Sequence, residues 1–265
     1  MKDRYYLGVD VGSVSSKAVI MNRNKEIVKT SVVQLGTGTS GPKQALDKLF
    51  SDTGLSLEDI SVTVGTGYGR NSLAYADKQI SEISCHAKGI NYEFKNVRTV
   101  LDIGGQDVKA ISIDGLGRVL NFYMNDKCAA GTGRFLEVMA RILGVNVDEL
   151  ENLDEHAKNP VTVSSTCTVF AESEVISLLS QETKIEDIVR GVHNSIVNRA
   201  LALLYKTNVE EDFTLTGGVA QNKGVIRALE RALNKKIYVA ERPQLIGAIG
   251  AAIFAYEAKE ERGKK

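Results

Sequence analysis

One motif occurs twice in this chain, and it constrains the fold more than any other feature of the sequence. The segments 10–18 and 102–110 both read Asp, apolar residue, Gly, four variable residues, Lys, Ala. In each copy an apolar run leads to the aspartate and a second apolar run leaves the turn, which is typical of a strand-turn-strand hairpin. A glycine turn of this kind offers backbone N–H groups to an anionic ligand.

The similarity between the two copies continues beyond the hairpins. Polar turns at 22–25 and 114–117 lead into third apolar runs at 27–33 and 119–123. An internal repeat of this length predicts two homologous halves. The alternative is two unrelated hairpins, which the shared register of Asp, Gly and Lys makes less favoured. We expect a first domain of residues 1–97 with 247–265, and a second of residues 98–246.

Composition places the chain among soluble globular proteins. It has 265 residues, of which 43% are hydrophobic and 25% charged, so two modest domains are expected. Since 33 basic residues balance 33 acidic ones, neither nucleic acid nor an anionic membrane is indicated as a partner. Residues 246–256, the longest apolar run, are too few to span a bilayer. Residues 1–5 lack the apolar core of a signal peptide, and three cysteines fit a reducing compartment, so we expect a cytoplasmic protein.

Further elements follow from local patterns. A helix around 45–50 should end near Gly54, and a strand at 60–64 leads into the glycine cluster 65–70, which is either a loop near the site or a plain turn. Strands are expected at 213–216 and 237–240, and a helix at 223–233. Between them, Gly217 and Gly218 would let a flat ligand lie against bare backbone.

Each of two cysteines precedes a predicted helix. Cys128 comes before a helix containing residues 135–143, and Cys167 before one containing residues 169–179. Backbone N–H groups at a helix start lower the pKa of a nearby thiol. Polar neighbours, among them residues 164–166 and 168, argue against a dry core around Cys167. Two thiolates are half the ligands of a tetrahedral zinc ion or a [4Fe-4S] cluster, and a two-fold dimer would supply four.

The remaining cysteine and two histidines suggest no metal site. Cys85 and His86 are adjacent, a spacing too tight for a shared metal ion, so a structural role is expected for both. His193 falls on a predicted helix and is expected to be solvated or hydrogen-bonded.

At this point a family resemblance emerges. The two hairpins and the strand-Gly-Gly-Val segment resemble the phosphate and adenosine motifs of the actin, sugar kinase and heat-shock chaperone superfamily. More narrowly, segments 102–107, 125–133 and 217–222 are similar to those of the ATP-dependent activators of 2-hydroxyacyl-CoA dehydratases and the ATPase subunits of benzoyl-CoA reductases. The resemblance covers the whole chain. It implies an α/β fold of two duplicated actin-like (ribonuclease H-like) domains, with mixed sheets flanked by helices and a nucleotide between them.

The resemblance also implies an activity. A member of this family is an ATP-hydrolysing homodimer that holds one [4Fe-4S] cluster through Cys128 and Cys167 of each subunit. It takes an electron from ferredoxin or flavodoxin and passes it to an iron-sulfur dehydratase or reductase. The resemblance implies ATP, ADP and Mg²⁺ as ligands of the site.

Residue roles are carried over by position. Asp10 and Asp102 would hold Mg²⁺ through water and orient the attacking water. The expected contacts to nucleotide are Gly12, Ser13, Ser16, Lys17, Gly104, Gly105 and Gln106 at the phosphates, and Gly217, Gly218, Val219, Gln221 and Gln244 at adenosine.

Two other functions stay open on the sequence. A small-molecule kinase of the same superfamily would share both hairpins but would not require cysteines at helix starts. A zinc-linked regulatory ATPase dimer would explain the cysteines without redox chemistry.

Overall fold

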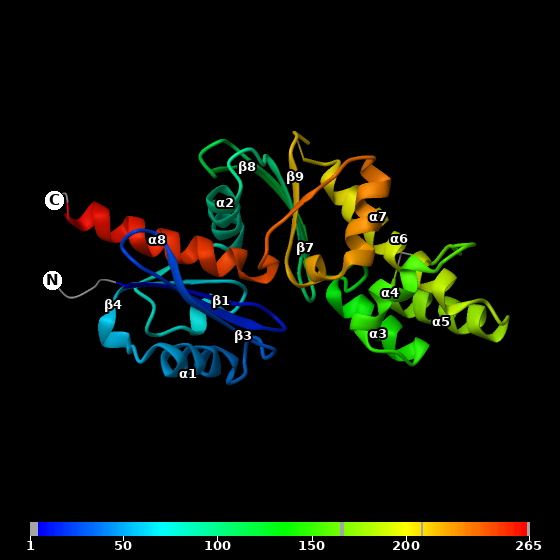
Figure 1. Ribbon diagram of the computed structural model, residues 1–265, viewed down its shortest axis with the longest axis horizontal. Coiled ribbons are helices and arrows are strands. Elements are labelled where there is room, and N and C mark those ends of the chain that lie inside the picture. The colour runs from blue at the N-terminus through cyan, green and yellow to red at the C-terminus, as the bar shows by residue number, and fades with distance from the viewer. Residues whose placement is uncertain (1–4, 165–166, 208, 264–265) are drawn as a thin grey trace. The chain divides into compact units, whose positions relative to one another are not determined.

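The chain forms two compact units. The computed structural model describes residues 5–164, 167–207 and 209–263. The first unit comprises residues 1–97, 113–120 and 244–265, and the second comprises residues 98–112 and 121–243 (Figure 1). The predicted domain bounds differ from these units at residues 113–120 and 244–246.

The first unit is built on a five-stranded mixed sheet in the order β3-β2-β1-β4-β5. β1 pairs antiparallel with β2 and parallel with β4. The strands are β1 (Tyr5–Val11), β2 (Ser16–Met21), β3 (Ile27–Val33), β4 (Ile60–Thr66) and β5 (Lys78–Gln79), and the helices are α1 (Gly41–Thr53), α2 (Glu82–Glu93) and α8 (Ile246–Gly263). As predicted, α1 ends at Gly54, which takes a φ of 68° and donates its N–H to the carbonyl of Phe50.

The second sheet repeats the strand order of the first. It runs β10-β9-β6-β7-β8, with β6 antiparallel to β7 and parallel to β9. Its strands are β6 (Thr99–Ile103), β7 (Val108–Ile113), β8 (Val119–Asn125), β9 (Phe213–Thr216) and β10 (Tyr238–Val239). The second unit's helices are α3 (Gly133–Leu143), α4 (Leu150–Glu155), α5 (Thr168–Ser180), α6 (Ile185–Leu204) and α7 (Lys223–Leu233). Because β6 to β10 occupy the places of β1 to β5, the predicted duplication is confirmed.

Each unit has its own core, and the sequence explains both. The paired central strands β6 and β7 are buried along their whole length, and β1 and β2 nearly so, which suits strands covered on both faces. On α3 the buried residues Phe135, Leu136, Met139 and Leu143 form one apolar stripe.

Short 3₁₀ turns connect the elements at Leu57–Asp59, Arg70–Ser72, Val147–Glu149, Gly218–Gln221 and Pro243–Leu245. Within the described ranges, no helix combines the length and apolarity needed to cross a membrane.

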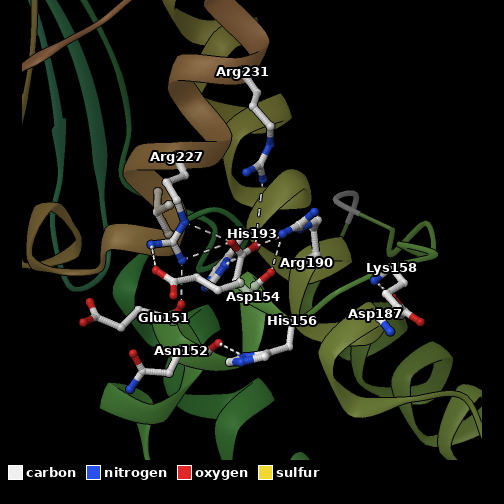
Figure 2. Close-up of polar contacts among 12 residues, drawn as sticks. Glu151, Asn152, Asp154, His156, Lys158, Asp187, Arg190, His193, Arg227 and Arg231 are labelled. Carbon is white, nitrogen blue, oxygen red and sulfur yellow. Dashed lines mark hydrogen bonds and ion pairs between the residues drawn. The ribbon is translucent and has the colours of Figure 1, made fainter.

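A fully buried carboxylate ties three helices of the second unit together. Asp154 on α4 accepts from Arg227 on α7 at 3.1 and 3.3 Å and pairs with Arg190 on α6 at 3.4 Å (Figure 2). Arg231 lies 3.9 Å away, and the Nδ1 of His193 lies 3.2 Å from the same carboxylate. A buried charge is tolerated only when it is paired. Helices α4, α6 and α7 must therefore stay packed so that Asp154 keeps its partners.

The charges in this cluster are set by its surroundings. Burial alone would raise the pKa of Asp154, but the hydrogen bond from His193 and the arginines hold that pKa below its ordinary value. Burial lowers the pKa of His193 despite its bond to Asp154, and Arg227 and Arg231 lower it further. His193 is therefore a neutral, hydrogen-bonded side chain and not a solvated one.

Replacement of Asp154 should destabilise the second unit. Asp154→Asn removes the shared carboxylate from three guanidinium groups, of which Arg227 keeps its pair with Glu155. We expect the free energy of unfolding to fall by about 3 kcal/mol, the lower end for buried pairs, because the arginines keep some contact with water. Urea denaturation measures this loss. In the control Asp47→Asn, which breaks the exposed Lys43–Asp47 pair, the change should stay under about 0.5 kcal/mol. Equal effects of the two substitutions would contradict the role of Asp154.

Stability should also decrease in mild acid because of His193. Since folding lowers the pKa of this imidazole, the unfolded chain binds its proton first as the pH falls. The free energy of unfolding should therefore drop as the pH falls through about 6.5, the ordinary value for histidine. We expect His193→Gln to reduce this pH dependence between pH 7.5 and 5.5, measured by urea denaturation. Parallel curves for the two proteins would show that His193 contributes nothing to it.

Candidate functional site

Both hairpin turns close in the same way. The N–H of Gly12 donates to the carbonyl of Ser15 at 3.0 Å, and the N–H of Gly104 donates to that of Asp107 at 2.9 Å. The second turn is also bonded to the start of α3, because the N–H groups of residues 133 and 134 donate to the carbonyls of residues 104 and 105. Both turns are thus fixed by backbone hydrogen bonds.

Each turn carries a buried Asp-Lys pair. Asp10 lies opposite Lys17 in the register of β1 and β2, and their side chains approach to 3.4 Å. Asp102 lies opposite Lys109 in β6 and β7, with side chains 3.2 Å apart. The two carboxylates are only 6% and 3% exposed. Each pair lies at the strand ends that flank a glycine turn, where phosphate and a hydrated divalent cation could bind.

The second pair is stabilised by a further carboxylate. Lys109 also contacts Asp107 in the turn. Although burial alone would lower it, Asp102 and Asp107 raise the pKa of Lys109 above its ordinary value. Lys109 therefore stays charged.

A Thr-Gly pair after the next strand completes each site, and the sequence analysis did not identify this second repeat. Thr66 lies opposite Asp10, and Thr216 lies opposite Asp102. The glycine that follows each threonine has a φ of 86°. A β-carbon on these glycines would lie 2.4 and 2.9 Å from Oδ1 of the respective aspartate, so no side chain fits there. The sequence pattern that indicates this repeat is a strand that ends in Thr-Gly in both halves. The cluster 65–70 thus packs against Asp10.

The two threonines differ in one bond. The hydroxyl of Thr216 donates to Oδ1 of Asp102 at 2.9 Å. The hydroxyl of Thr66 is fully buried and lies beside the thiol of Cys85, which is only a weak hydrogen-bonding group. The carboxylate of Asp102 is therefore fixed by a threonine as well as by its lysine.

The other predicted phosphate contacts lie in the two turns. Ser13 and Gly105 are half-buried, and Gln106 is exposed. Ser16 is buried, and its hydroxyl donates to the carbonyl of Leu35 at 2.7 Å. That hydroxyl supports the backbone beside the turn.

The predicted adenosine segment has an open backbone. Gly218 is exposed, and a β-carbon there would meet nothing within 4 Å. Val219 is buried in the core of the second unit, whereas Gln221 is exposed. Asn222 then caps α7 by accepting from the N–H of Val225. Gln244 is half-buried in the 3₁₀ turn Pro243–Leu245 of the first unit.

Both predicted ligand cysteines are free and half-buried in the second unit. Cys167 occupies the N-cap of α5, where its side chain makes no capping hydrogen bond. Cys128 lies further from its helix than expected, in the loop four residues before the N-cap Thr132 of α3. The helix-start argument therefore applies to Cys167 and not to Cys128. Helices α3 and α5 pack against each other. The predicted polar neighbours Ser165 and Thr166 lie outside the described residues.

Cys85 differs from these two cysteines. It is fully buried in α2, and burial raises its pKa to about 12. Throughout the described part of the chain, no group of three or more His, Cys, Asp or Glu side chains is arranged to hold a metal ion. Thiolate sulfur is the usual ligand of an iron-sulfur cluster, so these two free thiols would supply two of four ligands and a second chain would have to supply the others.

The bond between Thr216 and Asp102 can be tested with a matched pair of substitutions. Thr216→Val removes a donor to a buried carboxylate and should lower the free energy of unfolding by about 1–2 kcal/mol. Thr66→Val removes a buried hydroxyl that faces only a thiol, a weak hydrogen-bonding group, so the loss should be clearly smaller. Urea denaturation compares the two. A similar loss in both variants would contradict this assignment.

Comparisons with known proteins identify the family of this chain. Residues 7–255 match the model of the BadF/BadG/BcrA/BcrD ATPase family. The chain is 57% identical over 258 residues to the activator of lactoyl-CoA dehydratase of Anaerotignum propionicum, covering 97% of this chain and all of that protein.

Solved structures give the same relationship. The activator of the 2-hydroxyisocaproyl-CoA dehydratase from Clostridium difficile, determined with bound ADPNP, is 52% identical, with a TM-score of 0.94 and 98% of each chain covered. MreB 5 of Spiroplasma citri, at 13% identity and a TM-score of 0.56 over 98% of each chain, shares the fold alone. The chain has the predicted duplicated actin-like fold and belongs to the BadF/BadG/BcrA/BcrD ATPase family.

Proposed function

We propose that this protein is an ATP-hydrolysing activator that transfers single electrons to an iron-sulfur 2-hydroxyacyl-CoA dehydratase. The observation that carries the proposal is the presence of two Asp-Lys hairpins and two half-buried free thiols in one chain. Relatives of 52–57% identity over nearly the whole length carry the name of dehydratase activators.

One ATP would be held by both hairpins. Gly12, Ser13 and Lys17 would contact its phosphates from the first turn, and Gly104, Gly105 and Gln106 from the second; the hydroxyl of Ser16 supports the first turn. The exposed backbone at Gly218, with Gly217, Val219, Gln221 and Gln244, would flank adenosine. Backbone N–H groups and a buried lysine provide the positive potential that polyphosphate requires.

Asp10 and Asp102 would hold the water shell of Mg²⁺ and orient the attacking water. Mg²⁺ suits this site because it keeps several of its waters and binds through few carboxylates. When bound it supplies positive charge to the phosphoryl oxygens. The lysine opposite each aspartate pairs with the carboxylate and keeps it in place, so the site is organised before the nucleotide arrives.

Cys128 and Cys167 of two subunits would hold one [4Fe-4S] cluster. The bound cluster would accept and release one electron. Next to Cys167, Val169 and Phe170 on α5 are 64% and 67% exposed, and Phe122 on β8, upstream of Cys128, is 46% exposed. Large exposed apolar side chains next to Cys167 in sequence, and on the strand that leads toward Cys128, favour a protein-protein interface, as a homodimer requires.

The electron would come from ferredoxin or flavodoxin and pass to the iron-sulfur partner enzyme. Such exchange takes place in the cytoplasm, where we propose the protein acts. ATP hydrolysis would give the transfer its direction.

The thiols provide the decisive test. Protein purified without oxygen should contain about four iron and four sulfide ions per dimer and change its EPR spectrum on reduction. Cys128→Ser and Cys167→Ser should each lose the cluster and the dimer but keep ATP binding. The matched control Cys85→Ser alters the buried third cysteine and should keep the cluster. Zinc without sulfide, or a colourless monomer that phosphorylates a small molecule, would contradict the proposal.

A further inference from the structure

The turn of the second hairpin, residues 104–107, is bonded to helix α3 through its carbonyl groups. The N–H of Gly133 donates to the carbonyl of Gly104 at 2.9 Å, and the N–H of Arg134 donates to that of Gly105 at 2.9 Å. A β-carbon on Gly133 would lie 3.3 Å from the carbonyl oxygen of Gly104 and 3.4 Å from the α-carbon of Gly105. The turn and the start of α3 are therefore in close contact and form one hydrogen-bonded unit.

These carbonyl groups share peptide planes with the N–H groups proposed to bind phosphate. The carbonyl of Gly104 and the N–H of Gly105 belong to one planar group, and the carbonyl of Gly105 and the N–H of Gln106 belong to the next. Among the described residues, neither N–H donates a hydrogen bond. A phosphate at these N–H groups would act on the same two planes that α3 holds from the opposite side. Because hydrogen bonds in series polarise one another, bound phosphate should strengthen the attachment of α3.

Thr132 occupies the N-cap of α3 but does not cap the helix with its side chain. A threonine at this position ordinarily accepts from an N–H two or three residues further on. Here no such bond is made, and the hydroxyl donates to the carbonyl of Ala129 at 2.6 Å. The N–H of Thr132 donates to the same carbonyl at 3.1 Å, and the residue is fully buried. The hydroxyl therefore closes the turn 129–132.

The turn 129–132 directly follows Cys128 and is fixed on both sides. The carbonyl of Cys128 accepts from the side-chain amide of Asn125, at the end of β8, at 3.3 Å. Gly131 has a φ of 84°, and a β-carbon there would lie 2.8 Å from the side chain of Arg199 on α6. The segment has little room to adjust by itself, so a shift of the turn is passed on to Cys128.

The first hairpin is connected differently. The carbonyl of Gly12, which corresponds to that of Gly104, accepts from the N–H of Thr37 at 2.9 Å. Thr37 lies in the loop between β3 and α1, which contains no cysteine. The connection from a glycine turn to a half-buried thiol therefore belongs to the second hairpin.

We propose that Thr132 is a positioning residue that couples a nucleotide at the second hairpin to the thiol of Cys128. The inference rests on the proposed contact of Gly105 and Gln106 with phosphate. Bound phosphate fixes the two peptide groups and keeps α3 attached to the turn, and the Thr132 hydroxyl then holds Ala129 and the neighbouring thiol in one position. Without phosphate the start of α3 shifts more readily against the turn, and the thiol segment shifts with it.

Alkylation of Cys128 measures this coupling. The full-length protein is stripped of metal by a chelator, which is then removed, and iodoacetamide is added with or without Mg²⁺ and the ATP analogue ADPNP. Peptide mass analysis gives the rate at Cys128. We expect ADPNP to slow the wild-type rate about fivefold or more, the lower end for coupled sites. Thr132→Ser keeps the hydroxyl and should show the same slowing. Thr132→Val keeps the shape without the hydroxyl, so its rate should hardly respond to ADPNP.

Thr207 provides the matched control. It is also buried in the second unit, and its hydroxyl donates to the carbonyl three residues earlier, that of Leu204, at 2.7 Å. Thr207→Val therefore removes the same kind of bond at a place without contact to the turn 129–132. ADPNP should slow the alkylation of Cys128 in this variant as much as in the wild type.

Gly133→Ala tests the other end of the connection. Its methyl group would press against the carbonyl of Gly104, so the slowing should weaken although Thr132 is unchanged. Slowing of wild-type size in Thr132→Val, or no slowing in a wild type that binds ADPNP, would overturn the proposal. If Thr132→Val does not fold, equal slowing in Gly133→Ala and the wild type would overturn it. A wild-type protein that does not bind ADPNP would instead contradict the proposed function.

Discussion

The structure depends on a buried ion pair that spans the first two strands of each unit. Asp10 with Lys17, and Asp102 with Lys109, are opposite partners in antiparallel ladders. A slip of one residue would turn the lysine to the other face of the sheet and leave the aspartate uncompensated. The pair thus fixes the register of the hairpin, and the register fixes the glycine turn at which we propose that phosphate binds. Because such pairs gain little net stability, their place at a glycine turn is better explained by ligand binding than by folding.

The sequence predicted the parts of this site that are local. The hairpins, α1 with Gly54 at its end, and α7 after the double glycine were all recognisable from short patterns. The duplication was recognisable because Asp, Gly and Lys recur in register.

Contacts between distant segments could not be read in the same way. Thr66 pairs with Asp10 only because β4 is inserted beside β1, and no local pattern specifies that neighbour. His86 and Asp10 both lie near Gly247 only because α2 and α8 cross, and no local pattern specifies the crossing of two helices separated by most of the chain. Cys128 was placed too close to its helix because the turn at 129–132 has no distinct signature.

One helix connects the functional segments of the second unit. A β-carbon on Gly131, in the loop after Cys128, would lie 2.8 Å from the Arg199 side chain of α6, and one on Gly224 of α7 would lie 2.3 Å from His193. The hydroxyl of Ser195 donates to the carbonyl of Ser164, shortly before Cys167. Asp154 also links α4 and α7 to α6. Helix α6 therefore contacts the segments that carry Cys128 and Cys167 as well as α7, which follows the Gly217-Gly218 segment. These segments form one body and are expected to move together.

The burial of Cys85 has a practical consequence for chemical labelling. A thiol with a pKa near 12 is almost never a thiolate at neutral pH, and alkylating reagents attack the thiolate. Iodoacetamide should therefore leave this sulfur untouched in the folded protein and modify only the two half-buried ones. The mass added to the intact chain would then count the accessible thiols directly, and protection from the reagent would report a bound metal.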